Sequence, residues 1–177
     1  ALRLLQNETY PSWGYPVKHG ATTIWERWDG WTPENGFQDP GMNSFAHYSF
    51  GAVAEWMFKT IAGIDTDTPA YDHIVIHPRL GGSVTWAKAT YDSIHGPIAS
   101  AWRIMSNSRA NDEFRLYVTI PANTTATVHV PAKDADEVRE GRKHAGQAEG
   151  VRFVGMQDGA AVYEVGSGTY HFVAPLP

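Results

Sequence analysis

The sequence of 177 residues contains no cysteine, which excludes disulfides, zinc–thiolate sites and thiol nucleophiles. It also lacks any apolar run near the roughly 20 residues that a bilayer-spanning helix requires. No cluster of lysine or arginine stands out and the formal net charge is −5, so neither a nucleic-acid partner nor a membrane surface is indicated. The absence of cysteine leaves the compartment open, whether cytoplasmic, periplasmic or secreted.

The first ten residues, ALRLLQNETY, lack the basic region and apolar core of a secretory signal. Leu2, Leu4 and Leu5 have the spacing of the last turns of a helix, and no methionine precedes them. We therefore expect the sequence to be a piece of a longer protein.

The chain changes character near residue 70. Between about residues 44 and 62, apolar side chains recur at steps of three and four, which predicts one helix with a buried stripe. Asn43 or Ser44 is placed to cap its start, and Gly63 is placed to end it. The stripe consists of Phe45, Tyr48, Ala52, Val53, Trp56, Met57 and Ile61.

Residues 10–43 are dense in proline and glycine, which forbid a long regular element and indicate a long structured loop, with a short helical or extended piece around 21–28. Loops of this length inside a compact domain are usually functional.

After residue 70 the pattern is that of short strands separated by Gly, Pro, Asn and Asp, which favours an antiparallel sandwich. Turn residues predict hairpins around His95 and Gly96 and within residues 166–172. The charged stretch 132–150 is interpreted as a surface excursion. The predicted strands are 73–78, 83–93, 97–105, 114–121, 125–131, 151–158, 160–168 and 169–175.

A glutamate surrounded by tryptophans, in TTIWERWDGW at residues 22–31, is the first candidate for chemistry. Aromatic faces stack on pyranose rings while a carboxylate acts on the glycosidic bond, so Glu26 beside Trp25 suits sugar chemistry. The alternative is that Glu26 pairs with Arg27 or another cation and that the tryptophans form core. Both interpretations stay open on this motif alone.

His47, in NSFAHYSFG, falls off the predicted stripe. Helical spacing places it with Phe50, Gly51 and Ala54 on a second face that could line a cavity. The alternative is a capping or core histidine.

The other titratable residues have weaker patterns. Asp29, Glu34 and Asp39 share the loop and could supply a second carboxylate, although aspartate beside glycine is typical of turns. Asp65 and Asp67 lack the spacing of a calcium loop.

His73 and His77 would share one strand face as metal ligands. No supporting acid lies nearby in the sequence, so we interpret them as strand-edge residues and predict no metal site. The sequence contains no G-x-S-x-G, P-loop or G-x-G-x-x-G, so nucleotide-binding and serine-hydrolase hypotheses lack their usual motif.

Three ordered runs, residues 10–31, 42–64 and 74–102, closely resemble the C-terminal portion of bacterial α-L-rhamnosidases of glycoside hydrolase family seventy-eight. The resemblance implies the end of an (α/α)6 six-hairpin barrel over residues 1–68, followed by an antiparallel β-sandwich over 69–177. It also implies removal of terminal α-L-rhamnose from glycosides with inversion, without an organic cofactor. In the family pattern Glu26 is the general base and His47 contacts the sugar, with Trp25 beside them as a further substrate-binding residue.

The general acid of that family has no counterpart in this sequence, so the resemblance implies that the isolated chain is inactive. Its partners would be a rhamnose-containing glycoside and the missing N-terminal part of the same protein. Association of two chains through the apolar side of residues 44–62 is also expected, because this surface would otherwise be uncovered.

Two rival hypotheses remain at the level of the sequence. The first is a non-catalytic carbohydrate-binding or packing β-sandwich, in which Trp86, Tyr91 and Trp102 stack on glycans. Their alternating positions on central-looking strands favour a place in the core instead. The second is a different six-hairpin glycosidase with a related tail.

Overall fold

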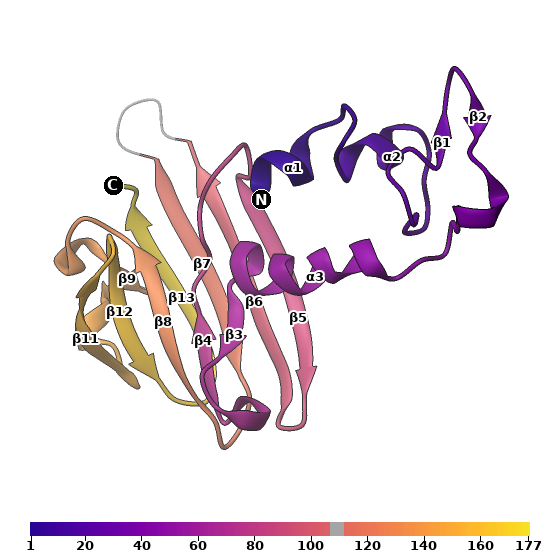
Figure 1. The fold of residues 1–177 in the computed structure, drawn as a ribbon. Helices are drawn as coiled ribbons and strands as arrows, with labels where there is room; N and C mark the ends of the chain where they lie inside the picture. Colours follow the sequence, from indigo (N-terminus) through magenta and orange to yellow (C-terminus); the bar gives the residue numbers. More distant parts are fainter. Residues whose placement is uncertain (107–111) are drawn as a thin grey trace. The chain divides into compact units, whose positions relative to one another are not determined.

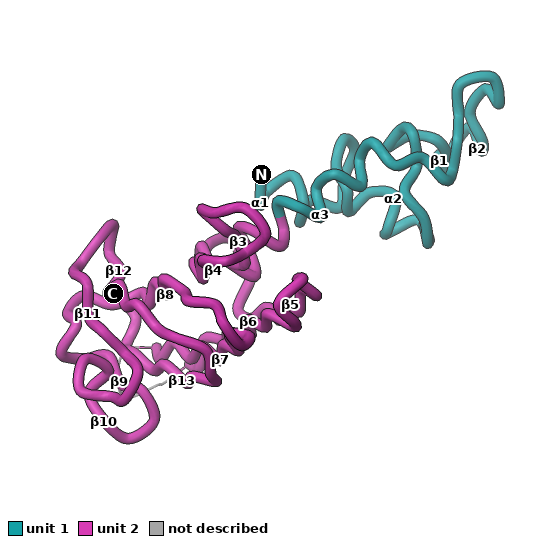
Figure 2. Tube along the Cα trace, turned by 90° about the horizontal axis from the view of Figure 1, so that it is seen from below, with its two compact units in different colours: residues 1–56 teal, residues 57–177 magenta. Residues whose placement is uncertain are grey.

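The computed structural model describes residues 1–106 and 112–177. The chain divides into two compact units, Ala1–Trp56 and Met57–Pro177, which Figure 2 shows in teal and magenta. The first is built of short helices and loops, and the second is mostly β-sheet, as expected (Figure 1). The domain boundary at residue 68 stays a prediction. No helix in the described ranges is long and apolar enough to cross a membrane.

The first unit has only short elements, in keeping with the many prolines and glycines between residues 11 and 41. Helix α1 confirms the helix predicted from the spacing of Leu2, Leu4 and Leu5. Helix α2 lies in the segment 10–43, which was expected to be a loop. Trp31 pairs with Phe37 in a two-stranded hairpin. The elements are α1 (Leu2–Gln6), α2 (Gly14–Lys18), β1 (Trp31–Thr32), β2 (Gly36–Phe37), η1 (Pro40–Met42), η2 (Ser49–Ala52) and α3 (Val53–Trp56).

The helix predicted for residues 44–62 begins later than expected. Residues 43–48 are not helical, and the first helical turn starts at Ser49. The predicted stripe is also not buried as a whole: Tyr48 is 87% exposed, whereas Ile61 is buried. The prediction of a stop at Gly63 is confirmed, since Gly63 has a φ of 78° and a Cβ there would lie 2.2 Å from the backbone N of Pro78.

The second unit contains two sheets. Their strand orders are β10-β9-β13-β7-β6-β5 and β11-β12-β8-β4-β3. All eight strands predicted after residue 70 are present, and the short β3, β9 and β10 were missed. The strands are β3 (Ile64–Thr66), β4 (His73–Ile76), β5 (Trp86–Ser93), β6 (Gly96–Met105), β7 (Glu113–Ile120), β8 (Thr125–Pro131), β9 (Arg139–Glu140), β10 (Lys143–His144), β11 (Val151–Gln157), β12 (Ala160–Val165) and β13 (Gly168–Pro175).

Helical turns join or precede several of these strands. They are the π-helical η3 (Met57–Ala62) and the 3-10 turns η4 (Pro69–Tyr71), η5 (Ala135–Glu137) and η6 (Ala145–Gln147). Strands β4 and β8 pair in parallel, because β5 to β7 of the other sheet connect them, whereas the other described pairs are antiparallel.

The core lies between the two sheets, where alternate residues of each strand are buried. On β7, Phe114, Leu116 and Val118 face inward. Tyr163 of β12 and Phe172 of β13 stack with ring centroids 5.6 Å apart, so they join one sheet to the other. The sandwich-like architecture expected from the sequence is confirmed.

One predicted hairpin is confirmed and the other is wrong. Ser93 pairs with Gly96 across the turn at Ile94 and His95, which closes β5 onto β6. Residues 166–168, in contrast, lead from β12 in one sheet to β13 in the other. The actual hairpin near the C-terminus joins β11 to β12 through Asp158 and Gly159, whose φ angles of 49° and 78° both lie in the left-handed region.

The three aromatic residues for which the sequence favoured a core position separate into two groups. Trp102 on β6 is only 2% exposed and points into the core. Trp86 and Tyr91 lie on β5, which is the edge strand of its sheet, and Trp86 is 68% exposed. Trp86 pairs with the exposed Arg103, so it lies on the outer face of the sheet, and strand alternation alone does not show which face of a strand is buried.

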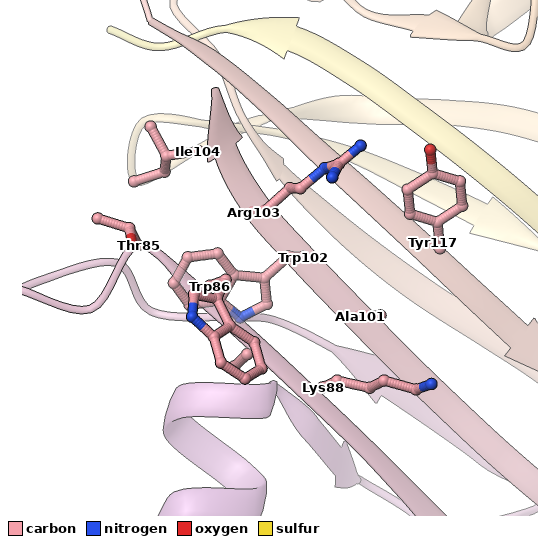
Figure 3. A pocket seen from close by; sticks show the side chains of 9 residues that line it. Thr85, Trp86, Lys88, Ala101, Trp102, Arg103, Ile104 and Tyr117 are labelled. Atoms are coloured by element: carbon pink, nitrogen blue, oxygen red, sulfur yellow. The ribbon is translucent and has the colours of Figure 1, made fainter. Parts of the chain in front are cut away.

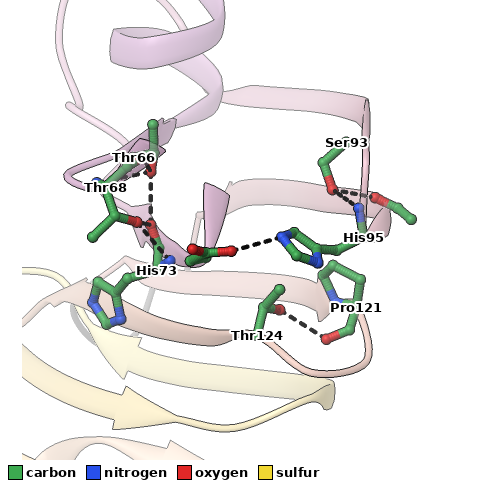
Figure 4. Close-up of polar contacts among 9 residues, drawn as sticks. Thr66, Thr68, His73, Ser93, His95, Pro121 and Thr124 are labelled. Atoms are coloured by element: carbon green, nitrogen blue, oxygen red, sulfur yellow. Dashed lines mark hydrogen bonds and ion pairs between the residues drawn. The ribbon is translucent and has the colours of Figure 1, made fainter. Parts of the chain in front are cut away.

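Polar side chains fix the ends of β4 and of the β5–β6 hairpin (Figure 4). The backbone N–H of His73 donates to Thr68 Oγ1 at 2.8 Å. His95 Nε2 lies 2.9 Å from Asp72 Oδ1, and the Ser93 hydroxyl donates to the Gly96 carbonyl at 2.8 Å. These contacts tie the β5–β6 turn to the start of β4.

Candidate functional site

Residues 23–26 and 44–47 lie side by side in the first unit, held by backbone hydrogen bonds. The Glu26 N–H donates to the Ser44 carbonyl at 2.8 Å, and the His47 N–H donates to the Ile24 carbonyl at 2.9 Å. The Thr23 hydroxyl donates to the Phe45 carbonyl. These bonds use the backbone groups of residues 44–47 that a helix would need, which explains why the helix starts only at Ser49.

The same pairing places Glu26 and His47 on adjoining segments, although they are 21 positions apart in the sequence. The Glu26 carboxylate is half-buried, and its Oε2 accepts a hydrogen bond from the Ser44 N–H at 2.8 Å. Among residues 1–106 and 112–177, no cation forms an ion pair with it. Arg27 instead pairs with Asp29 through Nε–Oδ1 and Nη2–Oδ2 contacts of 3.2 and 3.3 Å. The alternative of a Glu26–Arg27 pair is therefore wrong.

The three tryptophans of the Glu26 segment have different surroundings. Trp25 is 8% exposed and packs edge-on against Phe45, at 5.1 Å between ring centroids. Trp28 stacks on Phe50 at 4.7 Å with an interplanar angle of 18°. The ring of Trp31 lies beside the imidazole of His19, with 5.5 Å between the ring centroids. The three indoles thus pack against three different rings of the first unit.

The ring of His47 is half-buried and stacks in parallel on Tyr48, with centroids 5.7 Å apart. Because residues 43–48 are not helical, the helical face that was expected to group His47 with Phe50, Gly51 and Ala54 does not exist. His47 is placed by its bond to Ile24 instead. That bond brings it near Glu26 by a route that periodicity does not reveal.

The other acids of the loop have structural partners or are exposed. Asp29 pairs with Arg27, and Asp39 Oδ1 accepts a hydrogen bond from the Gly41 N–H at 2.8 Å at the start of η1. Glu34 is exposed. The turn role that the sequence offered for Asp39 is confirmed.

The sequence analysis missed the role of Asn43, which it treated as a helix cap. Asn43 Nδ2 donates to the Gly30 carbonyl at 2.9 Å, and its buried Oδ1 has no partner among the described residues. A Cβ on Gly30 would lie 2.7 Å from that Oδ1. Asn43 thus closes the loop of residues 30–43, which follows the Glu26 segment, and no local pattern signals a contact across 13 positions.

His73 begins β4 and His77 directly follows its last residue, and each of the two contacts β8. The His73 ring nitrogens lie 2.7 and 2.8 Å from the hydroxyls of Thr125 and Thr127. His77 stacks on His129 at 3.8 Å between centroids, and burial lowers the pKa of His77 to about 4, with His129 as a second cause. The described residues contain no group of three or more potential metal ligands of the His, Cys, Asp or Glu type.

The comparisons with known proteins agree for both parts of the chain. Residues 1–61 match the family model of the bacterial alpha-L-rhamnosidase 6 hairpin glycosidase domain, and residues 63–145 match that of the bacterial alpha-L-rhamnosidase C-terminal domain. An alpha-L-rhamnosidase of Streptomyces avermitilis is 48% identical over 172 residues, and one of Formosa agariphila is 36% identical over 172 residues. These matches cover 97% of this chain but only 15% and 18% of the relatives.

Solved structures give the same result. The crystal structure of the S. avermitilis alpha-L-rhamnosidase complexed with L-rhamnose matches with a TM-score of 0.84 at 46% identity, over 97% of this chain and 16% of that one. The alpha-L-rhamnosidase from Dictyoglumus thermophilum matches with a TM-score of 0.80 at 31% identity, over 98% of this chain and 18% of that one.

Proposed function

Since this chain belongs to the bacterial α-L-rhamnosidase family, as a C-terminal portion with part of the six-hairpin domain and the C-terminal domain, we propose that the longer protein removes terminal α-L-rhamnose from glycosides. In this proposal the reaction proceeds with inversion, Glu26 is the general base, and His47 and Trp25 contact the sugar. The chain spans about a sixth of the relatives that it matches, so the activity belongs to the longer protein.

The observation that carries the proposal is the environment of the Glu26 carboxylate. A general base must hold negative charge and keep one oxygen available for water. The Ser44 N–H stabilises charge on Oε2, while Oε1 has no hydrogen-bond partner among the described residues. Arg27 is engaged by Asp29, and no cation within residues 1–106 and 112–177 forms a salt bridge with Glu26. The carboxylate is therefore arranged to accept a proton.

Trp25 and His47 have separate roles in this proposal. Trp25 is almost buried against Phe45, so only a small part of its surface remains to contact a sugar, and the rest excludes water from Glu26. His47 has ring nitrogens that can bond sugar hydroxyls, and its ring orientation is supported by Tyr48.

An inverting hydrolase also needs a general acid, with its carboxyl group about 6.5–9.5 Å from that of the base. Asp29 and Asp39 are engaged by Arg27 and by the Gly41 N–H. We therefore assign the general acid to the part of the longer protein outside these residues. The 177-residue chain alone should not hydrolyse an aryl rhamnoside.

The test is Glu26→Gln in the longer protein. Loss of the base should reduce kcat on an aryl α-L-rhamnoside by about 10²–10⁴-fold, with KM nearly unchanged. Azide should restore part of the turnover, because an anionic nucleophile needs no deprotonation, and the product should be the β-rhamnosyl azide.

Glu34→Gln is the matched control, since Glu34 is an exposed acid of the same loop, and it should leave kcat unchanged. Near-normal turnover of Glu26→Gln, or an α-configured azide product, would contradict the assigned role. His47→Ala should mainly raise KM, and unchanged values of both constants would remove His47 from the site.

A further inference from the structure

A hollow lies on the outer face of the six-stranded sheet of the second unit. It has a volume of about 610 Å³ and follows β5, β6 and β7. Its floor is Ala101, and Figure 3 shows Lys88, Arg103 and Tyr117 arranged around this small residue. The face opposite the core of a sandwich is normally covered by longer polar side chains, so a depression of this size needs an explanation.

The strand register creates the depression. Lys88 pairs with Ala101, and Ala101 pairs with Tyr117, so one methyl group separates two long side chains. With strands about 4.8 Å apart, the Cα atoms of Lys88 and Tyr117 are about 10 Å from each other, which leaves room for one pyranose ring over Ala101. Trp86 pairs with Arg103 on the next rung of the same face.

Two aromatic rings border this space. Trp86 is 68% exposed, so its indole surface is open to a ligand. Tyr117 is also exposed, and it stacks on His171 at 4.0 Å with an interplanar angle of 10°, which supports its ring from one side. An exposed tryptophan on an edge strand loses little by stacking on the C–H face of a sugar and gains apolar burial.

Two cations, Lys88 and Arg103, border the hollow. Lys88 and Arg103 are exposed, and neither has an ion pair among residues 1–106 and 112–177, although the whole chain carries a net charge of −5. Arg115, in contrast, is neutralised by Glu113 at 2.6 Å. Asp92 shares the outer face of β5 but lies four residues, or about 13 Å, from Lys88.

We propose that this face is a second carbohydrate-binding site, specific for an anionic sugar such as a uronic acid. Trp86 and Tyr117 contact the faces of the sugar rings, and Lys88 and Arg103 bind the carboxylate. Other anionic ligands could also stack on aromatic rings, and the choice of a sugar among them rests on the proposed function. The negative charge follows from the two unpaired cations, and the site would hold an acidic polysaccharide while its rhamnose is removed elsewhere in the protein.

The test is calorimetric titration of the longer protein with trigalacturonate, which contains no rhamnose and is not consumed. Its fully methyl-esterified form is the neutral control of the same shape. The acid should bind about tenfold more tightly than the ester, and 0.5 M NaCl should abolish most of this difference. Lys88→Gln and Arg103→Gln should each weaken binding of the acid about tenfold. Trp86→Ala should lower the affinity for both the acid and the ester about fivefold or more.

Lys133→Gln and Arg142→Gln, which remove exposed cations elsewhere, should leave the affinity unchanged and so exclude a general charge effect. Equal affinity for acid and ester, or no effect of Trp86→Ala, would refute the proposal. Tighter binding of oligo(dT) or of an oligo-aspartate of equal charge would identify a different class of partner and would refute it as well.

Two further measurements test whether this face is open in the longer protein and whether the binding site is independent of the proposed function. Protection of Trp86 from hydroxyl-radical oxidation in the longer protein would show that another part of that protein covers the face, and the site would not exist. Glu26→Gln should retain full affinity for trigalacturonate. If Glu26→Gln also retained its turnover, the proposed function would fail while the binding result stood independently.

Discussion

The indole of Trp102 offers a quantitative test of how the second unit is held together. Its ring is 2% exposed, and Nε1 donates to the Ile61 carbonyl at 2.7 Å. One rung away on the same face, the hydroxyl of Ser100 donates to the Ala62 carbonyl, also at 2.7 Å. The two side chains of β6 thus bind the last carbonyls of η3, which have no partner within the helix itself.

The cost of Trp102→Phe follows from these contacts. Leaving the Ile61 carbonyl buried without a donor costs about 1–3 kcal/mol. The smaller ring also leaves a void, which adds about 1 kcal/mol. The sum is about 2–4 kcal/mol, and at about 2–4 °C per kcal/mol for a chain of this size the melting temperature should fall by about 5–15 °C.

Thermal unfolding followed by calorimetry measures this loss, and Trp86→Phe is the matched control. Trp86 lies on the neighbouring strand but faces outward, so its substitution should change stability by less than about 0.5 kcal/mol. Equal melting temperatures of the two variants would refute the assignment of Trp102 to the core. If Trp102→Phe does not fold, Ser100→Ala removes a hydrogen bond alone and should cost about 1 kcal/mol.

Three further predictions concern other parts of the chain. Gly63→Ala should lower the free energy of unfolding by about 3 kcal/mol or more, because the new Cβ adds a backbone clash to the strain of a positive φ. Gly20 has a φ of 86° but open space around it, so Gly20→Ala should cost only about 1 kcal/mol. Denaturant unfolding of both variants measures the difference. His77 has a pKa lowered to about 4 beside His129, so its neutral form stabilises the fold; this contribution is complete above pH 6.5 and is lost as the pH falls toward 4. The melting temperature of His77→Gln should therefore change less between pH 6.5 and 4 than that of the unmodified chain. Parallel pH profiles of the two proteins would contradict this. The isolated chain should associate at high concentration in light scattering, and Tyr48→Ser should reduce the association because this exposed ring is part of the apolar surface; a monomer at all concentrations would contradict it.

Much of the fold follows from local pattern. The β-branched runs between turn residues locate every strand of four or more residues, since alternation of side chains is a property of the strand itself. Gly63 ends a helix because its φ of 78° suits a residue without a Cβ. The motifs around Glu26 and His47 were sufficient to indicate the family, which the matches over residues 1–61 and 63–145 confirm.

The tertiary structure decided what local pattern could not. Residues 44–47 have helical spacing, yet their backbone groups bond to residues 23–26, because this neighbouring segment satisfies the same donors and acceptors that a helix turn would. Trp86 and Trp102 look alike in the alternating pattern, but Trp86 pairs with Arg103 on the outer face of the sheet, whereas Trp102 faces the core. The sequence therefore determined which segments are strands and which family they belong to. Pairing between distant segments determined which side chains are buried and what surrounds Glu26, because hydrogen-bond partners and burial depend on neighbours that lie far away along the chain.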